Sequence, residues 1–440
     1  GIAAAVLLGV AAAVAIAVLD FQGGAGGAPA TSPAATLDVA LPSAAAPGVA
    51  EPDVEAPVVE KPVVGVTMAR VSLAEADPKA VCNNGEPAAY YRRLAPNSSS
   101  WFVWLEGGGW CWSNISCHMR SKRKTADVWR GESLHFSHGV WDPASPVSGF
   151  NIIYVPYCSS DAHLGDVAAE DNVAGMPLRG ARIVRAAMRH AMAARPGGIS
   201  AGNLVVFGGV SAGGRGALVH LDTLVPYGVL PEGVRLLGFL DSVDYMEMPT
   251  FHGLDSWGHN VTKQTRGVMS LMHNEEFLAG GGACDLEDVW KCAFGEHRLR
   301  LLRTPFLLAG SMYDEYQLWL ATGKNCCPYP SPQEEYFAFS NSFANHTREQ
   351  VLQLPQVGSG TAGIFLTSCY DHGLSKHTPF LTETVLGVSM AQALQQAIDF
   401  VSSQGGQKAT PMPRVVEPCT GLHCGSGCSK RMTLPEDRFK

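Results

Sequence analysis

Residues 203–218, Asn203-Leu-Val-Val-Phe-Gly-Gly-Val-Ser-Ala-Gly-Gly-Arg-Gly-Ala-Leu, contain the most informative pattern of the sequence. An apolar run leads directly into Gly209-Val-Ser211-Ala-Gly213, and an amphipathic segment follows and ends at Pro226. A strand, a sharp turn that bears one serine, and a helix are the context that a nucleophile elbow needs. Glycines flank the serine because a β-carbon would clash where the turn presses the entering and leaving backbone together. The sequence therefore predicts a catalytic serine, Ser211. The apolar face of the predicted helix is formed by Ala217, Leu218, Leu221, Leu224 and Val225.

A phosphate-binding loop is the other structure that joins a strand to a helix through several glycines. Such a loop ends in Gly-Lys followed by Ser or Thr, whereas this chain has Gly213-Gly-Arg215. The start of the predicted helix favours negative charge that develops at Ser211. The pattern therefore favours an acyl-transfer site over a nucleotide site.

Five further apolar runs of four or five residues alternate with longer amphipathic stretches along the chain. Buried strands separated by helices are typical of a mainly parallel sheet that is covered on both faces. We therefore predict an α/β fold, α/β-hydrolase-like, with a mainly parallel central sheet, helices on both faces and disulfide-stapled loops. The expected strands are Trp101–Leu105, Asn151–Val155, Leu204–Phe207, Leu236–Leu240, Pro305–Ala309 and Gly363–Leu366.

A nucleophilic serine needs a general base and a carboxylate that orients the base. In α/β-hydrolases the acid and the histidine follow the serine along the chain, at the ends of later strands. Asp314 follows one such predicted strand and His372 follows the next. We therefore expect Asp314 and His372 to form the triad with Ser211. The alternatives that stay open are His377 as the base and Asp241 as the acid.

Three consecutive glycines follow the first predicted strand, in Trp101-Phe-Val-Trp-Leu-Glu-Gly-Gly-Gly-Trp-Cys111. Glycine lets backbone N–H groups point into a site without side chains that cover them. The N–H groups of Gly108 and Gly109, together with that of Ala212, would then bind the oxyanion of a tetrahedral intermediate. A tight structural turn is the alternative explanation for the three glycines.

Composition excludes several classes of protein. The chain has 440 residues, of which 46% are hydrophobic and 16% charged, so it can bury a large core and is not globally disordered. Its net charge is −8, and −5 of this lies in the first 66 residues, which leaves about −3 for the other 374. Such a domain has no general electrostatic attraction to nucleic acid, and we expect no nucleic-acid partner.

The N-terminal part differs from the rest in composition. Residues 2–19 are apolar and uncharged, a length on the border between a signal-peptide core and a membrane-spanning helix. We expect residues 1–20 to be a signal peptide or a signal-anchor helix, with a buried helix of the domain as a third reading. Residues 21–70, rich in Ala, Pro and Gly, are expected to be an extended linker.

Twelve cysteines lie beyond this segment, from Cys82 to Cys428. An even cysteine count, an apolar N-terminus and glycosylation sequons together indicate an oxidising compartment. We therefore expect the secretory pathway, with the protein either secreted or anchored as a type II membrane protein through residues 2–19. The four sequons begin at Asn97, Asn114, Asn260 and Asn345.

Several of these motifs together resemble the pectin acetylesterase family, which also contains the secreted deacylase Notum. The resemblance covers roughly Ala80 to Ser429 and implies a catalytic domain over residues 71–430 with a short tail at 431–440. It implies the same serine, aspartate and histidine as the triad, and no cofactor. The motifs are Leu-Glu-Gly-Gly-Gly-Trp-Cys (105–111), Leu-Arg-Gly-Ala-Arg (178–182), Gly-Gly-Val-Ser-Ala-Gly-Gly (208–214), Tyr313-Asp314 and Ser368-Cys-Tyr-Asp-His372.

The resemblance also bears on the cysteines near the end of the chain. Cys419, Cys424 and Cys428, with His423 between them, have a spacing that a zinc site could use. The oxidising context and the cystine-bearing tail of the family favour disulfides and no metal. Cys284 and Cys292 resemble another pair of the family.

Three functions are compatible with the sequence. The first is a serine carboxylesterase that removes O-acyl groups, chiefly acetyl, from extracellular or cell-wall polysaccharide such as pectin. The second is a Notum-like deacylase that removes a fatty acyl group from a secreted protein, so the partner is an acylated polysaccharide or an acylated glycoprotein. The third is an inactive glycan-binding relative. The basic run Arg120–Lys124 is expected on a helix, as a solvated face or as a contact for an anionic polysaccharide.

Overall fold

The protein is described from a computed structural model of its 440 residues. The residues that the structure describes all lie within the unit Pro62–Lys440. The predicted signal or anchor segment, the predicted linker up to residue 64 and the predicted tail at 431–440 lie outside them. The described residues are 65–121, 131–194, 197–253, 260–280, 284, 286–323, 333–403, 410–422, 424–425 and 427–428.

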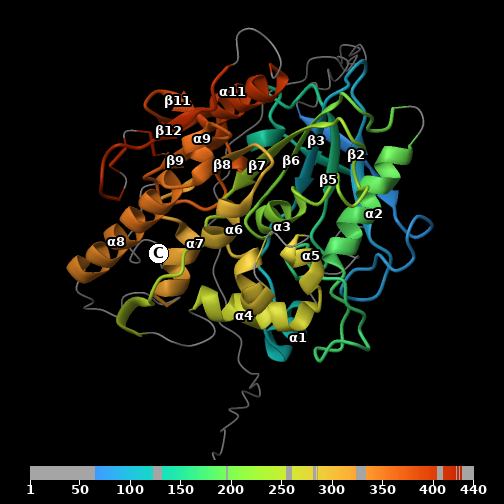
Figure 1. The fold of residues 1–440 in the computed structure, drawn as a ribbon, viewed down its shortest axis with the longest axis horizontal. Helices are drawn as coiled ribbons and strands as arrows, with labels where there is room; N and C mark the ends of the chain where they lie inside the picture. Colours follow the sequence, from blue (N-terminus) through green and yellow to red (C-terminus); the bar gives the residue numbers. More distant parts are fainter. Residues whose placement is uncertain are drawn as a thin grey trace, which may run out of the picture. The chain divides into compact units, whose positions relative to one another are not determined.

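A 10-stranded sheet forms the centre of the described chain (Figure 1), with the strand order β12-β9-β8-β7-β6-β3-β5-β2-β1-β4. The strands from β12 to β5 in this order are parallel, and β2, β1 and β4 continue the sheet as antiparallel strands. The prediction of a mainly parallel sheet is therefore confirmed. The strands are β1 (Val66–Ser72), β2 (Ala89–Arg93), β3 (Trp101–Leu105), β4 (Ser133–Phe136), β5 (Asn151–Val155), β6 (Leu204–Val210), β7 (Arg235–Asp241), β8 (Phe306–Ser311), β9 (Ala362–Thr367) and β12 (Arg414–Val416), and β10 (Thr384–Val385) pairs with β11 (Val388–Ser389).

Helices cover both faces of this sheet because successive residues of each strand point to opposite sides. In β3, Trp101, Val103 and Leu105 pack into the core beneath α2 and α3, whereas Phe102 and Trp104 pack into the core beneath α11. The helices are α1 (Asn114–Ser121), α2 (Gly180–Ala193), α3 (Ala212–His220), α4 (Val261–Met272), α5 (Glu275–Ala279), α6 (Gly295–Arg298), α7 (Glu315–Ala321), α8 (Gln333–Leu352), α9 (Pro355–Ser359), α10 (Pro379–Thr382) and α11 (Met390–Ser402).

The structure differs from the sequence expectations in two places. Residues Val66 to Arg70, which we expected in the linker, belong to β1. Although this strand has exposed positions, its pairing with β2 and β4 holds it in the sheet. The helix after Ser211 ends at His220 instead of Pro226, and turns follow it. Leu221 and Leu224 are nevertheless buried in the same core as the helix.

Disulfide bonds staple the loops of the described chain, as expected. The predicted pair Cys284–Cys292 is present, and the three cysteines of the C-terminal tail are all bonded. Removal of one native disulfide from a small secreted domain typically costs about 2–5 kcal/mol, so these bonds contribute strongly to stability. The pairs are Cys82–Cys158, Cys111–Cys117, Cys284–Cys292, Cys369–Cys428 and Cys419–Cys424.

The turn between β6 and α3 packs against the end of β3 without room for side chains. A β-carbon on Gly213 would lie 2.0 Å from the carbonyl oxygen of Leu105, and one on Gly107 would lie 2.4 Å from the carbonyl oxygen of Val210. These two glycines therefore let the loop after β3 lie directly against the turn that carries Ser211.

This contact predicts the effect of a single methyl group. Gly213→Ala should lower the free energy of unfolding by about 1–3 kcal/mol or more, because the added carbon meets backbone that cannot move aside. Gly358→Ala is the matched control, since a β-carbon there meets nothing within 4 Å. Gly358→Ala, in α9, should leave the free energy of unfolding unchanged or raise it by up to about 1 kcal/mol. Urea unfolding measures both, and equal stability of the two variants would contradict the packing described.

Candidate active site

Ser211 lies at the sharp turn between β6 and α3, in a strained backbone conformation. Its φ of 56° and ψ of −121° lie outside the regions that residues other than glycine normally adopt. Its N–H donates to the carbonyl of Asp241 at 3.0 Å, and its carbonyl accepts from the N–H of Arg215 at 2.9 Å. The turn is thus fixed by the neighbouring strand on one side and by the first helical hydrogen bond on the other.

The structure brings Asp314 and His372 together from the ends of neighbouring strands. Oδ2 of Asp314 is 2.7 Å from Nδ1 of His372, and its Oδ1 accepts from the N–H of Gln317 at 2.8 Å. Asp314 is the N-cap of α7, so the carboxylate also lies where the helix dipole favours negative charge. One carboxylate therefore both begins a helix and orients the imidazole.

The loop that carries His372 meets the turn that carries Ser211. The N–H of Gly373 donates to Oγ of Ser242 at 2.9 Å, and a β-carbon on Gly373 would lie 2.9 Å from Cγ2 of Val210. Nε2 of His372 is buried and has no hydrogen-bond partner within the described part of the chain. The imidazole is thus held through Nδ1, and Nε2 is left available for a proton from a hydroxyl.

Burial and charge act in opposite directions on His372. Burial of the ring disfavours the charged form, but the charge and the hydrogen bond of Asp314 outweigh it, so the pKa of His372 lies above its ordinary value. The nearby charge of Asp241 acts in the same direction as Asp314, whereas Lys376 opposes it. An imidazole with this pKa can hold a proton taken from a hydroxyl and then release it.

The loop after β3 presents unpaired backbone donors beside Ser211. In the described residues, the N–H groups of Gly108, Gly109 and Ala212 have no hydrogen-bond acceptor. Gly108 and Gly109 have φ values of 146° and 68°, which favour glycine, and a β-carbon on Gly107 would lie 3.2 Å from Cβ of Ser211. Gly107, at the start of this loop, therefore lies against Ser211, and the oxyanion-hole role of Gly108, Gly109 and Ala212 stays a prediction.

Arg120 braces this loop, a role that the sequence did not indicate. Its Nη2 donates to the carbonyl of Gly108 at 2.7 Å, and its Nε donates to Oγ of Ser160 at 3.3 Å. The charge pattern had suggested a solvated face or a polysaccharide contact for residues 120–124. For Arg120 the structure shows instead an internal contact, and residues 122–124 lie outside the description.

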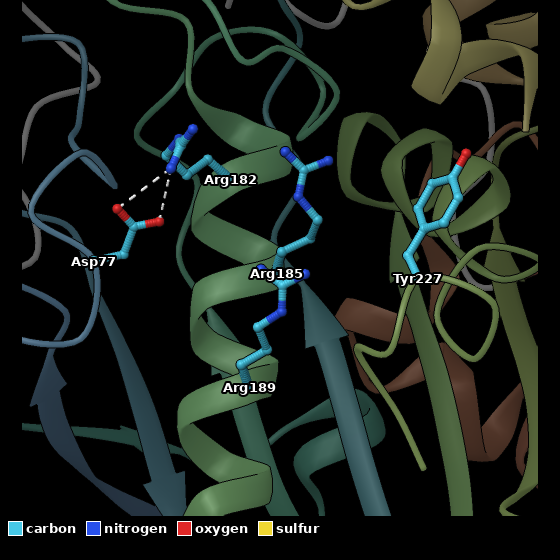
Figure 2. A pocket seen from close by; sticks show the side chains of 5 residues that line it. All are labelled: Asp77, Arg182, Arg185, Arg189 and Tyr227. Carbon is cyan, nitrogen blue, oxygen red and sulfur yellow. Dashed lines mark hydrogen bonds and ion pairs between the residues drawn. The ribbon is translucent and has the colours of Figure 1, made fainter. Parts of the chain in front are cut away.

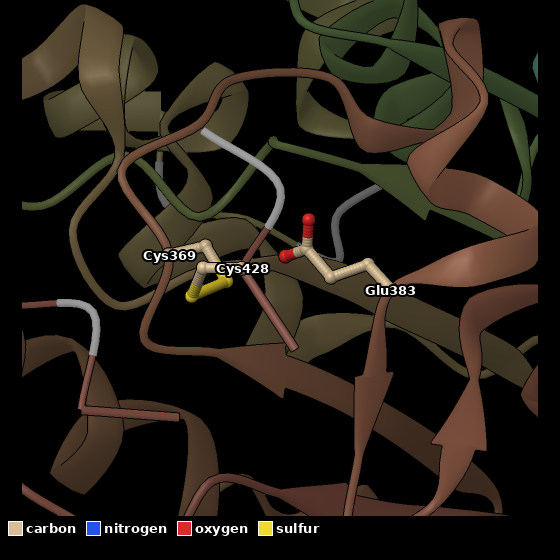
Figure 3. Close-up of side chains that lie close together, drawn as sticks. All are labelled: Cys369, Glu383 and Cys428. Carbon is tan, nitrogen blue, oxygen red and sulfur yellow. A yellow bond between two sulfur atoms is a disulfide. The ribbon is translucent and has the colours of Figure 1, made fainter. Parts of the chain in front are cut away.

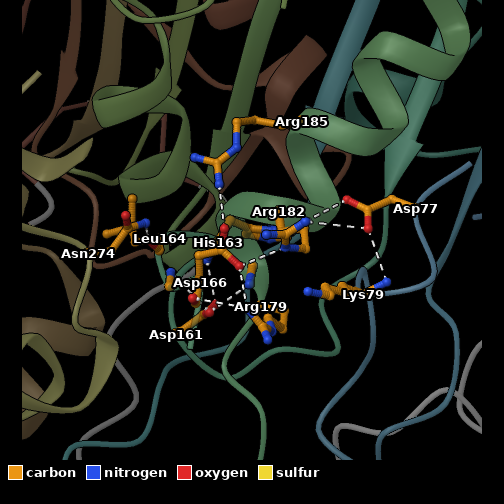
Figure 4. A network of polar contacts seen from close by, with 12 residues as sticks. Asp77, Lys79, Asp161, His163, Leu164, Asp166, Arg179, Arg182, Arg185 and Asn274 are labelled. Atoms are coloured by element: carbon orange, nitrogen blue, oxygen red, sulfur yellow. Dashed lines mark hydrogen bonds and ion pairs between the residues drawn. The ribbon is translucent and has the colours of Figure 1, made fainter. Parts of the chain in front are cut away.

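A polar network fixes the loop to which Arg120 and the glycine loop attach (Figure 4). Asp166 contacts Arg179, Arg182 and Arg185 of the α2 region at 2.7–2.8 Å. Asp161 is fully buried and accepts from the N–H groups of Gly180 and Gly165, although burial still raises its pKa to about 6. The N–H of Cys111 donates to the carbonyl of Ser160 in the same loop. The glycine loop is therefore tied to α2.

The alternative candidates occupy other positions. Asp241 accepts from the N–H of Ser375 at 3.0 Å and from the hydroxyls of Ser375 and Ser242, so it braces the loop that carries His372. His377 is exposed, at the end of a short 3-10 helix. Asp314 and His372 are the pair that the structure places in hydrogen-bond contact.

A further carboxyl group, Asp244, is buried close to this pair. Both of its oxygens lack a hydrogen-bond partner in the residues described, and Oδ1 lies 3.3 Å from where a β-carbon on Gly310 would be. Burial, and then the charge of Asp314, raise the pKa of Asp244 to about 7. Near neutral pH this group therefore carries a proton for much of the time.

The residue types that could hold a metal gather at Cys369, Glu383 and Cys428 (Figure 3). The two cysteines are bonded to each other, so neither offers the thiolate that a zinc site needs. Cys419 and Cys424 are likewise bonded to each other, and His423 lies outside the described residues. The tail is thus a disulfide-bonded segment, as the resemblance implied.

A pocket of about 310 Å³ lies along α2 and is lined in part by Arg182 and Arg185 of the Asp166 network (Figure 2). Figure 2 shows three arginine side chains spaced along the helix, with Asp77 bonded to the first of them. The lining residues are Asp77, Arg182, Arg185, Arg189 and Tyr227.

Two more residues at the site escaped the sequence analysis. The hydroxyl of Tyr245 lies 3.5 Å from Oγ of Ser211, and the guanidinium of Arg215 lies 3.4 Å from the centre of the Tyr245 ring. Tyr245 follows β7 and Arg215 belongs to α3, so a motif-based search had no reason to pair them. In the sequence, Arg215 could be noticed because it is a charged residue in the predicted helix, four positions after Ser211.

A strained serine after a parallel strand, an Asp–His pair at later strand ends and a glycine-rich loop are features that α/β-hydrolases share. Comparison with known protein families adds a match to the pectinacetylesterase family model over residues 61–419. The chain belongs to this family of carboxylesterases.

Individual relatives come from animals and plants. The chain is 24% identical over 373 residues to palmitoleoyl-protein carboxylesterase notum2 of Xenopus laevis, which covers 79% of this chain and 71% of the relative. It is 26% identical over 314 residues to pectin acetylesterase 11 of Arabidopsis thaliana, with 67% of this chain and 76% of the relative covered. Its structure resembles that of the Wnt deacylase Notum from Drosophila with a TM-score of 0.67 at 22% identity, covering 83% of this chain and 100% of the other.

The raised pKa of His372 can be measured directly. NMR titration should place its midpoint above the ordinary value of about 6.5, because the charged ring is stabilised by Asp314. Asp314→Asn should lower the midpoint. His220 is an internal control, since burial lowers its pKa to about 3 and its signals should not shift between pH 5 and 9. A His372 midpoint below 6.5, or one that Asp314→Asn leaves in place, would contradict the coupling.

Proposed function

We propose that this protein is a serine carboxylesterase that hydrolyses short O-acyl esters, chiefly O-acetyl, of extracellular or cell-wall polysaccharide such as pectin. The observation that carries the proposal is the 2.7 Å contact between Asp314 and His372 in a loop that meets the strained turn at Ser211. Membership of a family of carboxylesterases supports the same reaction class. The relatives named above include both a pectin acetylesterase and a palmitoleoyl-protein carboxylesterase, so the acetylated polysaccharide substrate is proposed on separate grounds.

In this proposal each residue has one task. Oγ of Ser211 attacks the acyl carbonyl carbon while Nε2 of His372 takes its proton. Asp314 stabilises the imidazolium that forms, and the N–H groups of Gly108, Gly109 and Ala212 bind the oxyanion. The imidazolium then protonates the departing alcohol, and water repeats the sequence on the acyl-enzyme.

The packing beside Ser211 supports a short acyl group. Trp110, which follows the glycine loop, is 3% exposed, and the guanidinium of Arg215 lies 3.8 Å from its ring centre. Tyr245 packs on the other side of Arg215 and is 2% exposed. These three side chains are stacked on one another, and the proposal assigns them the wall of the acyl site that limits chain length.

The Notum-like function is the second candidate, because most of the relatives named by the comparisons are palmitoleoyl-protein carboxylesterases. A fatty acyl chain would need a hydrophobic tunnel beside Ser211. An inactive glycan-binding protein is the third candidate, but binding alone gives no reason for the Asp314–His372 pair.

We further propose that the enzyme is secreted, or anchored through residues 2–19. The disulfide bonds of the folded part favour an oxidising compartment. The asparagines of three sequons, Asn97, Asn114 and Asn345, are exposed and so accessible to glycosylation. Among the helices that the structure describes, none has the length and apolar character that crossing a bilayer requires.

The triad is tested by single substitutions. Ser211→Ala and His372→Ala should each lower kcat for 4-nitrophenyl acetate by about 10³–10⁶-fold while the thermal transition is kept, because each removes a group on which the others depend. Asp314→Asn should cost less than either. His377→Ala is the matched control and should retain activity. A loss in His377→Ala without one in His372→Ala would reverse the assignment.

The acyl group is tested with 4-nitrophenyl esters from acetate to palmitate. We expect kcat/KM to be highest from acetate to butyrate. A tunnel would instead add about 0.8 kcal/mol per buried methylene, so kcat/KM would rise steadily with chain length. A rise that continues to eight carbons or more would contradict the short-acyl proposal and favour the Notum-like function.

A further inference from the structure

Tyr245 is the side chain whose polar atom lies beside the nucleophile but has no task in the triad. Its hydroxyl is 3.5 Å from Oγ of Ser211, and the residue is 2% exposed. It follows β7, the strand next to β6, so the backbone of the central sheet fixes its position. Its ring also packs edge-on against Tyr316, which in turn lies against the His372 ring.

Arg215 lies behind Tyr245 as a buried cation. The guanidinium is stacked between the rings of Tyr245 and Trp110, with 3.4 Å and 3.8 Å to the two ring centres. The residue is 3% exposed, and its Nε and Nη2 have no hydrogen-bond partner in the described part of the structure. Residues four apart lie on one helix face and lean towards the N-terminus, which directs Arg215 towards Ser211.

Burial of such a charge is costly, so its presence calls for an explanation. A charged side chain inside a protein destabilises the fold unless it is paired and hydrogen-bonded. The two aromatic faces offset part of that cost through cation–π contacts. No ion pair of Arg215 is present among the residues described, and negative charge that develops at Ser211 during the reaction would supply one.

We propose that Tyr245 is a further catalytic residue, whose hydroxyl donates a hydrogen bond to the oxyanion of the tetrahedral intermediate, and that Arg215 is a positioning residue that holds and polarises this phenol. The proposal rests on the proposed esterase reaction at Ser211. It adds a side-chain donor to the backbone donors of Gly108, Gly109 and Ala212.

The geometry allows this donation. The oxyanion forms on the carbon that bonds to Oγ of Ser211, so it lies next to Oγ and within reach of the Tyr245 hydroxyl. Oγ forms the new bond to carbon, its proton moves to Nε2 of His372, and the π electrons of the carbonyl become the oxyanion. Tyr245 donates a hydrogen bond but transfers no proton in this step.

The surroundings of Tyr245 keep it a donor. Burial raises the pKa of its phenol above the ordinary value, and the charge of Arg215 acts against that rise. The hydroxyl is therefore protonated at every working pH, while the cation against the ring increases its polarity. A buried donor of this kind needs no reorganisation when the oxyanion appears, which is the condition for strong electrostatic stabilisation.

Tyr245→Phe tests the hydroxyl alone. It should lower kcat for 4-nitrophenyl acetate by about 10- to 100-fold with KM little changed, a smaller loss than the roughly 10²–10³-fold that follows removal of an oxyanion-hole donor at ideal distance. Tyr90→Phe is the matched control, because Tyr90 is another buried tyrosine whose hydroxyl contacts Nδ1 of His190 at 2.9 Å, outside the site. It should keep kcat. Unchanged kcat in Tyr245→Phe would overturn the proposal.

Arg215→Met tests the cation. Its effect on kcat and on the melting temperature separates a positioning role from a purely structural one. It should lower kcat while the melting temperature stays equal or rises, because a buried unpaired charge is replaced by an apolar chain of similar length. In the Tyr245→Phe background the same substitution should lower kcat by a clearly smaller factor. A fall in melting temperature with kcat retained, or equal factors in both backgrounds, would overturn the role of Arg215.

The wild-type enzyme separates failure of this inference from failure of the proposed function. If wild type hydrolyses the acetate ester and Ser211→Ala does not, the esterase proposal stands and the Tyr245 and Arg215 variants decide this inference. If wild type has no Ser211-dependent activity, the proposed function fails and this inference fails with it.

Discussion

The strained turn at Ser211 is the constraint on which the rest of the site depends. A serine at φ 56° and ψ −121° costs on the order of 1–3 kcal/mol and persists only where its surroundings enforce it. The hydrogen bond to Asp241 in β7 and the close contact between Gly213 and Leu105 at the end of β3 enforce it here. Because three adjacent parallel strands share this edge, the sheet itself fixes Ser211 and the glycine loop against each other.

Buried charge around this turn is the second feature that sets the chemistry. The ionisable groups Asp241, Asp244, Asp314 and Arg215 are each at most 3% exposed. Of these carboxyl groups, Asp314 hydrogen-bonds to the imidazole, while Asp241 holds the loop of His372 in place. Excluding water from such groups strengthens their interactions and costs stability, a combination that is typical of catalytic sites.

Much of this arrangement could be predicted from the sequence, and the failures have physical reasons. The strands β3, β5, β6, β7, β8 and β9 are near-continuous apolar runs because both of their faces are covered, so β3 and β5 were predicted with their observed bounds. β1 and β4 are edge or near-edge strands with exposed positions, and their mixed pattern does not differ from that of a linker or loop. Asp314 and His372 followed from strand order and are found in contact.

The residues that the sequence did not reveal are those whose roles depend on contacts between distant segments. Arg120 belonged to a basic run, and charge alone could not show that its guanidinium binds the carbonyl of Gly108. Arg215 occupies a helix position that would ordinarily be apolar, and only the stacking of Trp110 and Tyr245 around it makes its burial intelligible.

The most direct test of the central claim is covalent labelling of the purified protein with a fluorophosphonate. Such a probe reacts with a serine that a neighbouring base activates and whose adduct an oxyanion hole stabilises. The account predicts one adduct per chain, mapped by mass spectrometry to the peptide that contains Ser211, and its loss in His372→Ala. An intact Ser211 in the wild-type protein after exposure to the probe would contradict the account and leave an inactive glycan-binding protein as the better description.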